Sequence, residues 1–237
     1  MATPVRFPGG ITNVRKSNPM GAFGLPDPTQ WHVYFNDFDD YVAGDWTITR
    51  VGTTPTEALA DINGGALLLT LSAADNDSDQ LQKKSESFLL TAGKKAFFKA
   101  RFKVSDATQS DFLMGLAVTD TTLLGAVDGA GVTDGIFFSK DDGDALLDVQ
   151  VQKDATTGQT RAAGIATVVS DTFLTVAWAY DGVSEVKYFV DDVQKGSLSA
   201  TSSYLPDTEL TVSFAIMNGE AVAKTMTIDY VFAAMER

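Results

Sequence analysis

A chain of 237 residues with 18 Lys and Arg against 31 Asp and Glu has a formal net charge of −13. So few basic residues cannot neutralise a phosphate backbone or hold the chain to an anionic membrane surface, so we expect neither nucleic acid nor a membrane as a partner. The absence of cysteine excludes thiolate catalysis, zinc–thiolate sites and disulfides.

The first 30 residues differ from the rest of the chain. They contain five of the seven prolines, which remove backbone donors, so neither a helix nor a central strand is expected. No apolar segment typical of a secretory signal begins the chain, and we expect synthesis in the cytoplasm. We predict an extended N-terminal arm, residues 1–30, that lies on a partner surface, followed by one domain, residues 31–237. The predicted contact residues of the arm are Val5, Arg6, Phe7, Ile11, Val14, Arg15, Lys16, Met20, Phe23 and Leu25.

From Trp31 onward, apolar and polar residues alternate with the period of two that is typical of half-buried strands. Strands are predicted at 66–71, 80–89, 95–104, 112–118, 135–139, 146–153, 161–168, 174–180, 186–190, 211–217 and 225–232. Asp181-Gly182 and Asp191-Asp192 predict tight turns, and the capping-box spacing of 54–57 predicts a helix of one or two turns. Many short strands without intervening helices predict an all-β, two-sheet antiparallel jelly-roll sandwich.

Three segments resemble a known family. They are 35–49 (FNDFDDYVAGDWTIT), the meander 172–196, and the closing 228–231 (IDYV). These segments are similar to the concanavalin A-like, laminin-G-type jelly rolls found among bacteriophage virion proteins, and the resemblance implies that fold here. The superfamily includes lectins, glucanases, adhesion modules and capsid decoration proteins, so the fold does not choose among these roles.

Catalytic residues are not apparent in the sequence. A glucanase of this fold would need carboxylates that alternate along one strand and so face the same cleft. The nearest candidate presents Asp148, Gln150 and Gln152 on one face, which we expect to be solvated. The single histidine, His32, has no nucleophile-elbow motif to join, and we expect it to pack or to be exposed. We therefore predict no catalytic residues, no cofactor and no enzyme activity.

An acidic loop is the weak candidate for a metal site. Asp75, Asp77 and Asp79 offer alternating carboxylates, as in calcium loops, but Gln80 stands where an EF-hand loop needs glycine. We expect a solvated turn without a metal there, and the same for Asp141-Asp142-Gly143-Asp144.

The arm and the resemblance together predict a non-enzymatic structural protein of a phage virion. It would be a capsid decoration or cement protein, made in the host cytoplasm, that binds the major capsid protein on the outside of the shell through its arm. We expect a homo-oligomer, and the three-fold positions of shells favour a trimer. Two alternatives stay open: a glycan-binding module or fibre and adhesion domain that holds surface glycans, and a lyase or hydrolase whose residues the sequence does not show.

Overall fold

The computed structural model describes residues 29–52, 55–124, 131–155 and 160–237. These residues form strands and one short 3₁₀ helix, η2 (Ala43–Asp45), so the predicted all-β class is confirmed. The strands are β1 (Trp31–Asn36), β2 (Trp46–Val51), β3 (Thr56–Leu59), β4 (Leu67–Thr70), β5 (Ser78–Lys83), β6 (Phe88–Leu89), β7 (Ala96–Val104), β8 (Ser110–Ala117), β9 (Gly135–Lys140), β10 (Leu146–Gln152), β11 (Thr160–Thr167), β12 (Leu174–Tyr180), β13 (Glu185–Val190), β14 (Val193–Ser199), β15 (Glu209–Asn218) and β16 (Thr225–Glu236).

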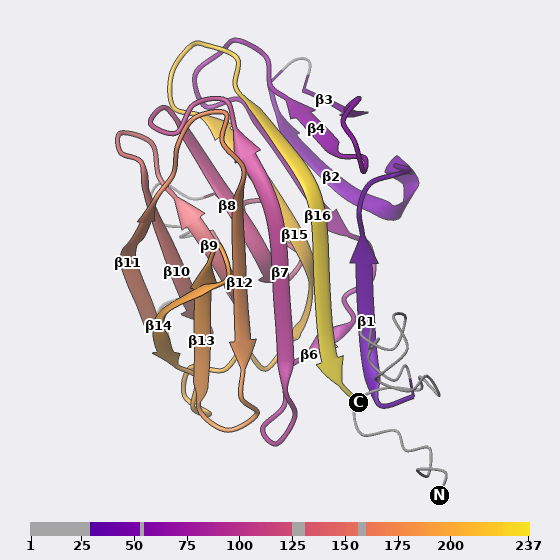
Figure 1. Ribbon diagram of the computed structural model, residues 1–237, viewed down its shortest axis with the longest axis vertical. Helices are drawn as coiled ribbons and strands as arrows, with labels where there is room; N and C mark the ends of the chain where they lie inside the picture. Colours follow the sequence, from indigo (N-terminus) through magenta and orange to yellow (C-terminus); the bar gives the residue numbers. More distant parts are fainter. Residues whose placement is uncertain (1–28, 53–54, 125–130, 156–159) are drawn as a thin grey trace, which may run out of the picture.

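Two eight-stranded antiparallel sheets pack face to face, as predicted. The first sheet has the order β14-β13-β12-β7-β16-β4-β3, with β1 also paired to β16. The second sheet has the order β11-β10-β9-β8-β15-β5-β2, with β6 also paired to β15. In Figure 1 the central strands of the first sheet, β12, β7 and β16, lie in front of those of the second.

The core lies between the two sheets and follows from the alternation of side chains along each strand. Along β7, for example, every second residue from Ala96 to Val104 is buried. Trp178 of the first sheet stacks on Phe98 with ring centroids 6.1 Å apart. Its indole nitrogen donates a hydrogen bond to the Ile136 carbonyl of the second sheet at 3.1 Å. This bond satisfies the one polar atom of a buried ring and ties the two sheets together.

The predicted helix at 54–57 is wrong, because Thr56–Leu59 is strand β3 and pairs in register with β4. A capping box satisfies backbone donors only where a helix of useful length follows, and only a few apolar residues follow this one. Pairing with β4 satisfies the backbone groups on the side of β3 that faces β4, while the other side is the edge of the sheet. Among the described residues, no helix is long and apolar enough to cross a membrane.

The two predicted tight turns are confirmed. Asp181 Oδ1 accepts hydrogen bonds from the backbone amides of the residues two, three and four positions later, while Gly182 has a φ of 82°. Asp191 and Asp192 have φ values of 49° and 62°, which joins β13 to β14 through a two-residue turn. Two consecutive residues with positive φ match the twist of the flanking strands.

Candidate functional site

Polar side chains lie on both sides of an apolar centre on the outer face of the second sheet, which is turned away from the first sheet. One row across seven strands comprises Arg161, Gln150, Phe137, Gly115, Ser213, Gln82 and Thr47. The adjacent row comprises Asp148, Ser139, Leu113, Ala215, Gln80 and Thr49. Hydrogen-bonding groups set side by side on a sheet can recognise a polar ligand laid across it.

The chain itself covers the middle of this face. The connection between β8 and β9, described over 118–124 and 131–134, folds back onto the second sheet. Leu123 and Val132 have no exposed surface and belong to a small second core. The members of that core are Leu113, Ala117, Leu123, Val132, Phe137 and Ala215. Apolar side chains of this connection therefore cover a part of the sheet face that would otherwise be exposed to solvent.

Glutamine side chains hold this connection by its backbone. Gln80 donates to the Thr121 carbonyl oxygen at 3.2 Å and accepts from the Leu123 amide at 2.8 Å. Gln82 accepts from the Asp120 amide at 2.9 Å. Each side-chain amide thus bonds the peptide groups that a buried segment must satisfy, and is not free for a ligand.

The expectation that Asp148, Gln150 and Gln152 form a solvated face is wrong. Their relative exposures are 5%, 0% and 1%. Gln152 donates to the Val132 carbonyl oxygen in the covering connection, and Gln150 donates to Ser139 Oγ at 3.1 Å. Alternation along a strand predicts which residues share a face, but it does not predict whether a distant segment covers that face.

An ion pair marks the end of the face near the β10–β11 edge. Arg161 Nε lies 3.1 Å from Asp148 Oδ2, and its Nη2 contacts the same oxygen. The Gly164 amide donates to Asp148 Oδ1 at 2.6 Å. The Arg161 side chain keeps 36% of its surface exposed. Asp148 is therefore held in place by donors on both oxygens, beside a guanidinium group that solvent reaches.

A second carboxyl group, Asp111, lies on the same face and is 7% exposed. The pairing of β10 with β9 and of β9 with β8 places it two strands from Asp148 and one side-chain step further along. The two Cα atoms are thus about 12 Å apart, from standard strand spacings. Burial, together with the negative charge of Asp142, raises the pKa of Asp111 to about 6. The two carboxyl groups of this face therefore differ in environment.

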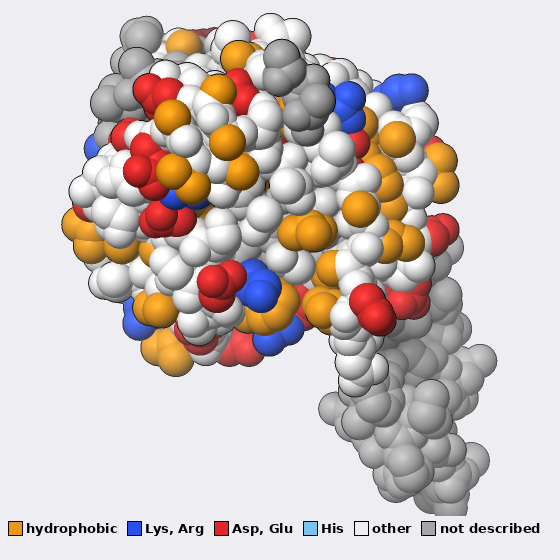
Figure 2. All heavy atoms as spheres, turned by 90° about the horizontal axis from the view of Figure 1, so that it is seen from above, with side chains coloured by type: hydrophobic (Ala, Val, Ile, Leu, Met, Phe, Trp, Pro, Cys, Tyr) orange, Lys and Arg blue, Asp and Glu red, His pale blue; other side chains and the backbone are white. Residues whose placement is uncertain are grey.

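Further acidic side chains surround Asp111 at this end of the sandwich, which is the upper end in Figure 1. They come from the connections β7–β8, β9–β10 and β15–β16, and Figure 2 shows acidic groups gathered there. Lys224 is 3% exposed and bridges Asp106 at 2.8 Å and Glu220 at 2.6 Å. The negative charges at this end are therefore only partly paired within the chain.

The sequence pattern does not identify Asp111 and Asp148 as a pair, because alternation along one strand shows only which carboxylates of that strand share a face. These two belong to different strands, and their closeness depends on the pairing of β8, β9 and β10. The one available signal was an aspartate, Asp111, within an otherwise apolar strand.

The weak metal candidates do not converge. Asp75 is exposed, while the Asp77 carboxylate accepts a hydrogen bond from Ser72 Oγ. Asp79 points between the sheets, beside Glu57. Successive side chains of a strand point to opposite faces, so Asp79 is separated from the outer face of its own sheet.

His32 lines a cavity of about 220 Å³ between β1 and the second sheet. Its Nε2 lies 3.0 Å from Ser87 Oγ. Burial, with a smaller effect of Arg237, lowers the pKa of His32. Among the described residues no carboxylate hydrogen-bonds the other ring nitrogen, so this Ser–His pair lacks the orienting acid of a catalytic triad.

The ten arm residues predicted to contact a capsid all lie within residues 1–28, outside the described residues. The contact prediction for the arm therefore stays a prediction.

No family model matches this chain, and no curated protein matches it. Solved structures share its fold at low identity. An endo-1,3-β-glucanase from Streptomyces sioyaensis is 14% identical, with a TM-score of 0.63 over 90% of this chain and 99% of the other. An endo-β-1,4-glucuronan lyase from the fungus Trichoderma reesei is 13% identical, with a TM-score of 0.59 over 85% and 94%. The carbohydrate recognition domain of Emp46p is 12% identical, with a TM-score of 0.54 over 84% and 94%.

These structures confirm the predicted concanavalin A-like jelly roll. They also correct the prediction that the chain is not an enzyme, because a glucanase and a lyase have the same sandwich. That prediction rested on the absence of cysteine, on the single histidine and on the lack of carboxylates that alternate along one strand. The pair on separate strands shows that such alternation is not the only way to bring two carboxyl groups to one face. The structures described above include no virion protein, so kinship with phage virion proteins gains no support from them.

Proposed function

We propose that this protein recognises a polysaccharide at the end of the outer face of the second sheet that carries Asp148, Arg161 and Asp111. The observation that carries the proposal is the Asp148–Arg161 pair, which combines a fixed carboxylate with a guanidinium group that solvent reaches. Sugar hydroxyl groups accept hydrogen bonds, and the exposed part of the Arg161 guanidinium group can donate to them. Asp148, which is 5% exposed and has donors on both oxygens, holds that guanidinium group in place. The fold supports the proposal, since a glucanase, a glucuronan lyase and a carbohydrate recognition domain share it.

The charge of the surroundings favours a neutral polysaccharide over an acidic one. Asp111, Asp141 and Asp142 lie close together next to the site and outnumber the one buried cation beside them, Lys140. The whole chain has a net charge of −13. A polymer of uronic acids would meet like charges there, and like charges facing one another disfavour association. We therefore name a neutral glucan as the ligand class.

The same two carboxyl groups are suited to acid–base chemistry on a bound glycan. With its pKa at about 6, Asp111 keeps a proton in mildly acidic solution and can give it to a leaving oxygen. Asp148 lies on the same face, with Arg161 and a backbone amide on its oxygens. Whether cleavage follows binding is decided by measuring the two separately.

Replacing Asp148 with asparagine, or Arg161 with glutamine, should weaken binding of the glucan at least tenfold, because each change removes one half of the pair. The measurement is affinity electrophoresis or calorimetry on laminarin and mixed-linkage β-glucan, with a glucuronan as the charged comparison. Arg101→Gln is the matched control, because Arg101 forms a similarly exposed pair with Asp229 on the first sheet. Loss of binding in the control variant to the same extent, or no binding to any glucan by the wild type, would contradict the proposal.

Release of reducing ends from the same glucans between pH 5 and 7 separates recognition from cleavage. If the protein cleaves the glucan, Asp111→Asn should abolish release while leaving binding within a factor of about three. If reducing ends are still released by this variant, Asp111 is not the proton donor.

The capsid decoration role remains a separate prediction that rests on the composition of residues 1–30 and on the resemblance described for residues 35–49, 172–196 and 228–231. Deleting residues 2–28 should abolish co-sedimentation with assembled shells if the arm binds the major capsid protein.

A further inference from the structure

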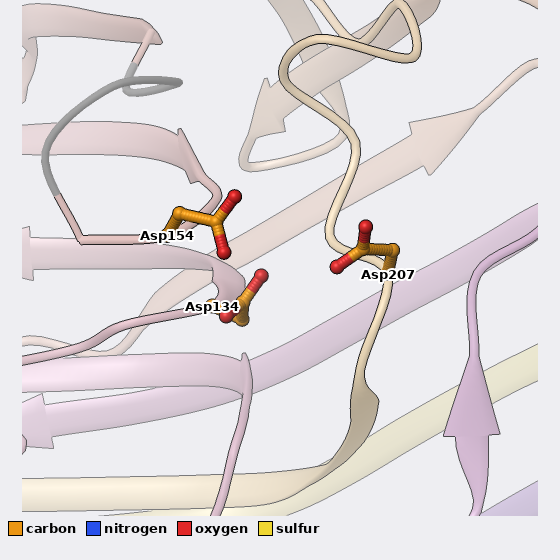
Figure 3. Close-up of side chains that lie close together, drawn as sticks. All are labelled: Asp134, Asp154 and Asp207. Atoms are coloured by element: carbon orange, nitrogen blue, oxygen red, sulfur yellow. The ribbon is translucent and has the colours of Figure 1, made fainter.

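Three aspartates from separate connections converge at the end of the sandwich opposite the acidic end. Asp134 directly precedes β9, Asp154 follows β10, and Asp207 lies shortly before β15. One carboxylate oxygen from each lies within 4.8 Å of the others. Figure 3 shows the three side chains turned toward one another from different segments. In the part of the chain that the structure describes, no other three acidic or histidine side chains converge in this way.

The burial of Asp134 is a second, separate observation. Asp134 is 4% exposed, and its Oδ1 has no hydrogen-bond partner among the described residues. A buried carboxylate oxygen without a partner is unfavourable, and two further carboxylates beside it add repulsion. A cation between the three groups would relieve both.

The neighbouring Gln152 has a similar unsatisfied oxygen. Its Nε2 donates to the Ala155 carbonyl oxygen at 3.1 Å, which places the side chain at the junction that carries Asp154. Its Oε1 is buried and has no partner among the described residues. Asp134 Oδ1 and Gln152 Oε1 are therefore two buried oxygen atoms without a donor among the described residues.

Lys153 is the cation already present. Its Nζ lies 2.5 Å from Asp207 Oδ2 and 3.4 Å from the Ser202 carbonyl oxygen. Three carboxylates and one ammonium group leave a net charge of −2 at the cluster, which a divalent cation would balance. If a metal ion took Asp207, the Ser202 carbonyl would remain as a partner for the ammonium group.

We propose that Asp134, Asp154 and Asp207 form a calcium site. Calcium binds six to eight oxygen ligands at 2.3–2.6 Å with flexible geometry, which suits carboxylates from three connections. Magnesium requires a more rigid octahedral arrangement, and the absence of histidine and cysteine from the cluster disfavours zinc and copper.

The ion would link three segments that are distant in sequence. Asp134 follows Val132, which belongs to the second core over the outer face. Binding would therefore hold the end of the covering connection to the β10–β11 hairpin and to the segment before β15. This inference does not depend on the proposed glycan site, which lies at the opposite end of the face.

The test titrates the metal-free full chain with calcium chloride by calorimetry and follows thermal unfolding. We expect a Kd of about 0.1–1 mM, typical of modules with few carboxylate ligands. At 10 mM calcium the Tm should rise by about 4–8 °C, because the ion binds only the folded state. No heat of binding and no rise in Tm at 10 mM calcium would overturn the proposal, and an equal rise with magnesium would overturn the choice of metal.

Variants with opposite expected effects make the assignment specific. Asp207→Asn should weaken calcium binding at least tenfold without lowering the Tm in chelator, because the Asp207 side chain is 62% exposed and its loss removes repulsion. Lys153→Met should tighten binding about tenfold, because the competing ammonium group is gone. Asp75→Asn is the matched control at the other end of the sandwich and should leave Kd unchanged within a factor of two. Weakening by Asp75→Asn as large as that by Asp207→Asn would place the ion elsewhere and overturn the proposal.

Discussion

Replacing Asp79 with asparagine should raise the stability of the protein at pH 8 by about 2 kcal/mol or more, with a Tm about 4–8 °C higher. Asp79 is fully buried, and burial with the neighbouring Glu57 raises its pKa to about 8. A proton on one of the two carboxyl groups lets it donate to the other, so the folded chain retains this proton at neutral pH. Asparagine can donate in the same place without having a proton to lose.

The pH dependence gives the sign of this effect. Between about pH 4 and pH 8 the folded chain holds a proton that unfolded Asp79 has released, so this group lowers stability as pH rises through that window. The gain from Asp79→Asn should therefore be near zero at pH 4 and largest at pH 8 and above. Chemical denaturation across pH 4–9 measures the difference between the two proteins. A gain that is the same at pH 4 and pH 8 would show that Asp79 does not hold the proton.

Replacing Gln82 with methionine should lower the free energy of unfolding by about 2–4 kcal/mol, because it removes three hydrogen bonds at a buried position. Gln82 donates to the Val118 carbonyl at 3.0 Å and to Ser213 Oγ at 2.9 Å, and it accepts from the Asp120 amide. Methionine preserves the volume but leaves the backbone groups at 118 and 120 without partners.

Hydrogen exchange locates the loss expected for Gln82→Met. The Asp120 amide should exchange much faster than in the wild type, while amides of the central strand β7 should keep their protection relative to global unfolding. Gln194→Met, at an exposed position on β14, is the control and should change stability by less than about 0.5 kcal/mol. Unchanged exchange at Asp120 would mean that Gln82 does not hold the covering connection.

The fold was predictable from local features, while the sites were not. The period of two predicted most strands, and Asp191-Asp192 predicted its turn, because both depend on residues close in sequence. The segment at 54–57 misled the prediction because its partner, β4, was not visible to a local pattern. Gln150 was expected in water for the same reason, since the segment that covers it follows a different strand.

The two candidate sites depend on pairing between distant segments. Asp111 and Asp148 share a face only because β9 lies between their strands. Asp134, Asp154 and Asp207 belong to three connections whose meeting point is set by the packed sandwich. No spacing within one stretch of sequence contains either arrangement.

The positions of β15 and β16 limit when the chain can fold during synthesis. β15 lies between β8 and β5 in one sheet, and β16 lies between β7 and β4 in the other. Until residues 209–236 have left the ribosome, both sheets lack a central strand, and the strands made earlier have open edges that can pair with other chains. Productive folding of this sandwich therefore waits for its last two strands, and a ribosome that stops before them releases a product prone to aggregation.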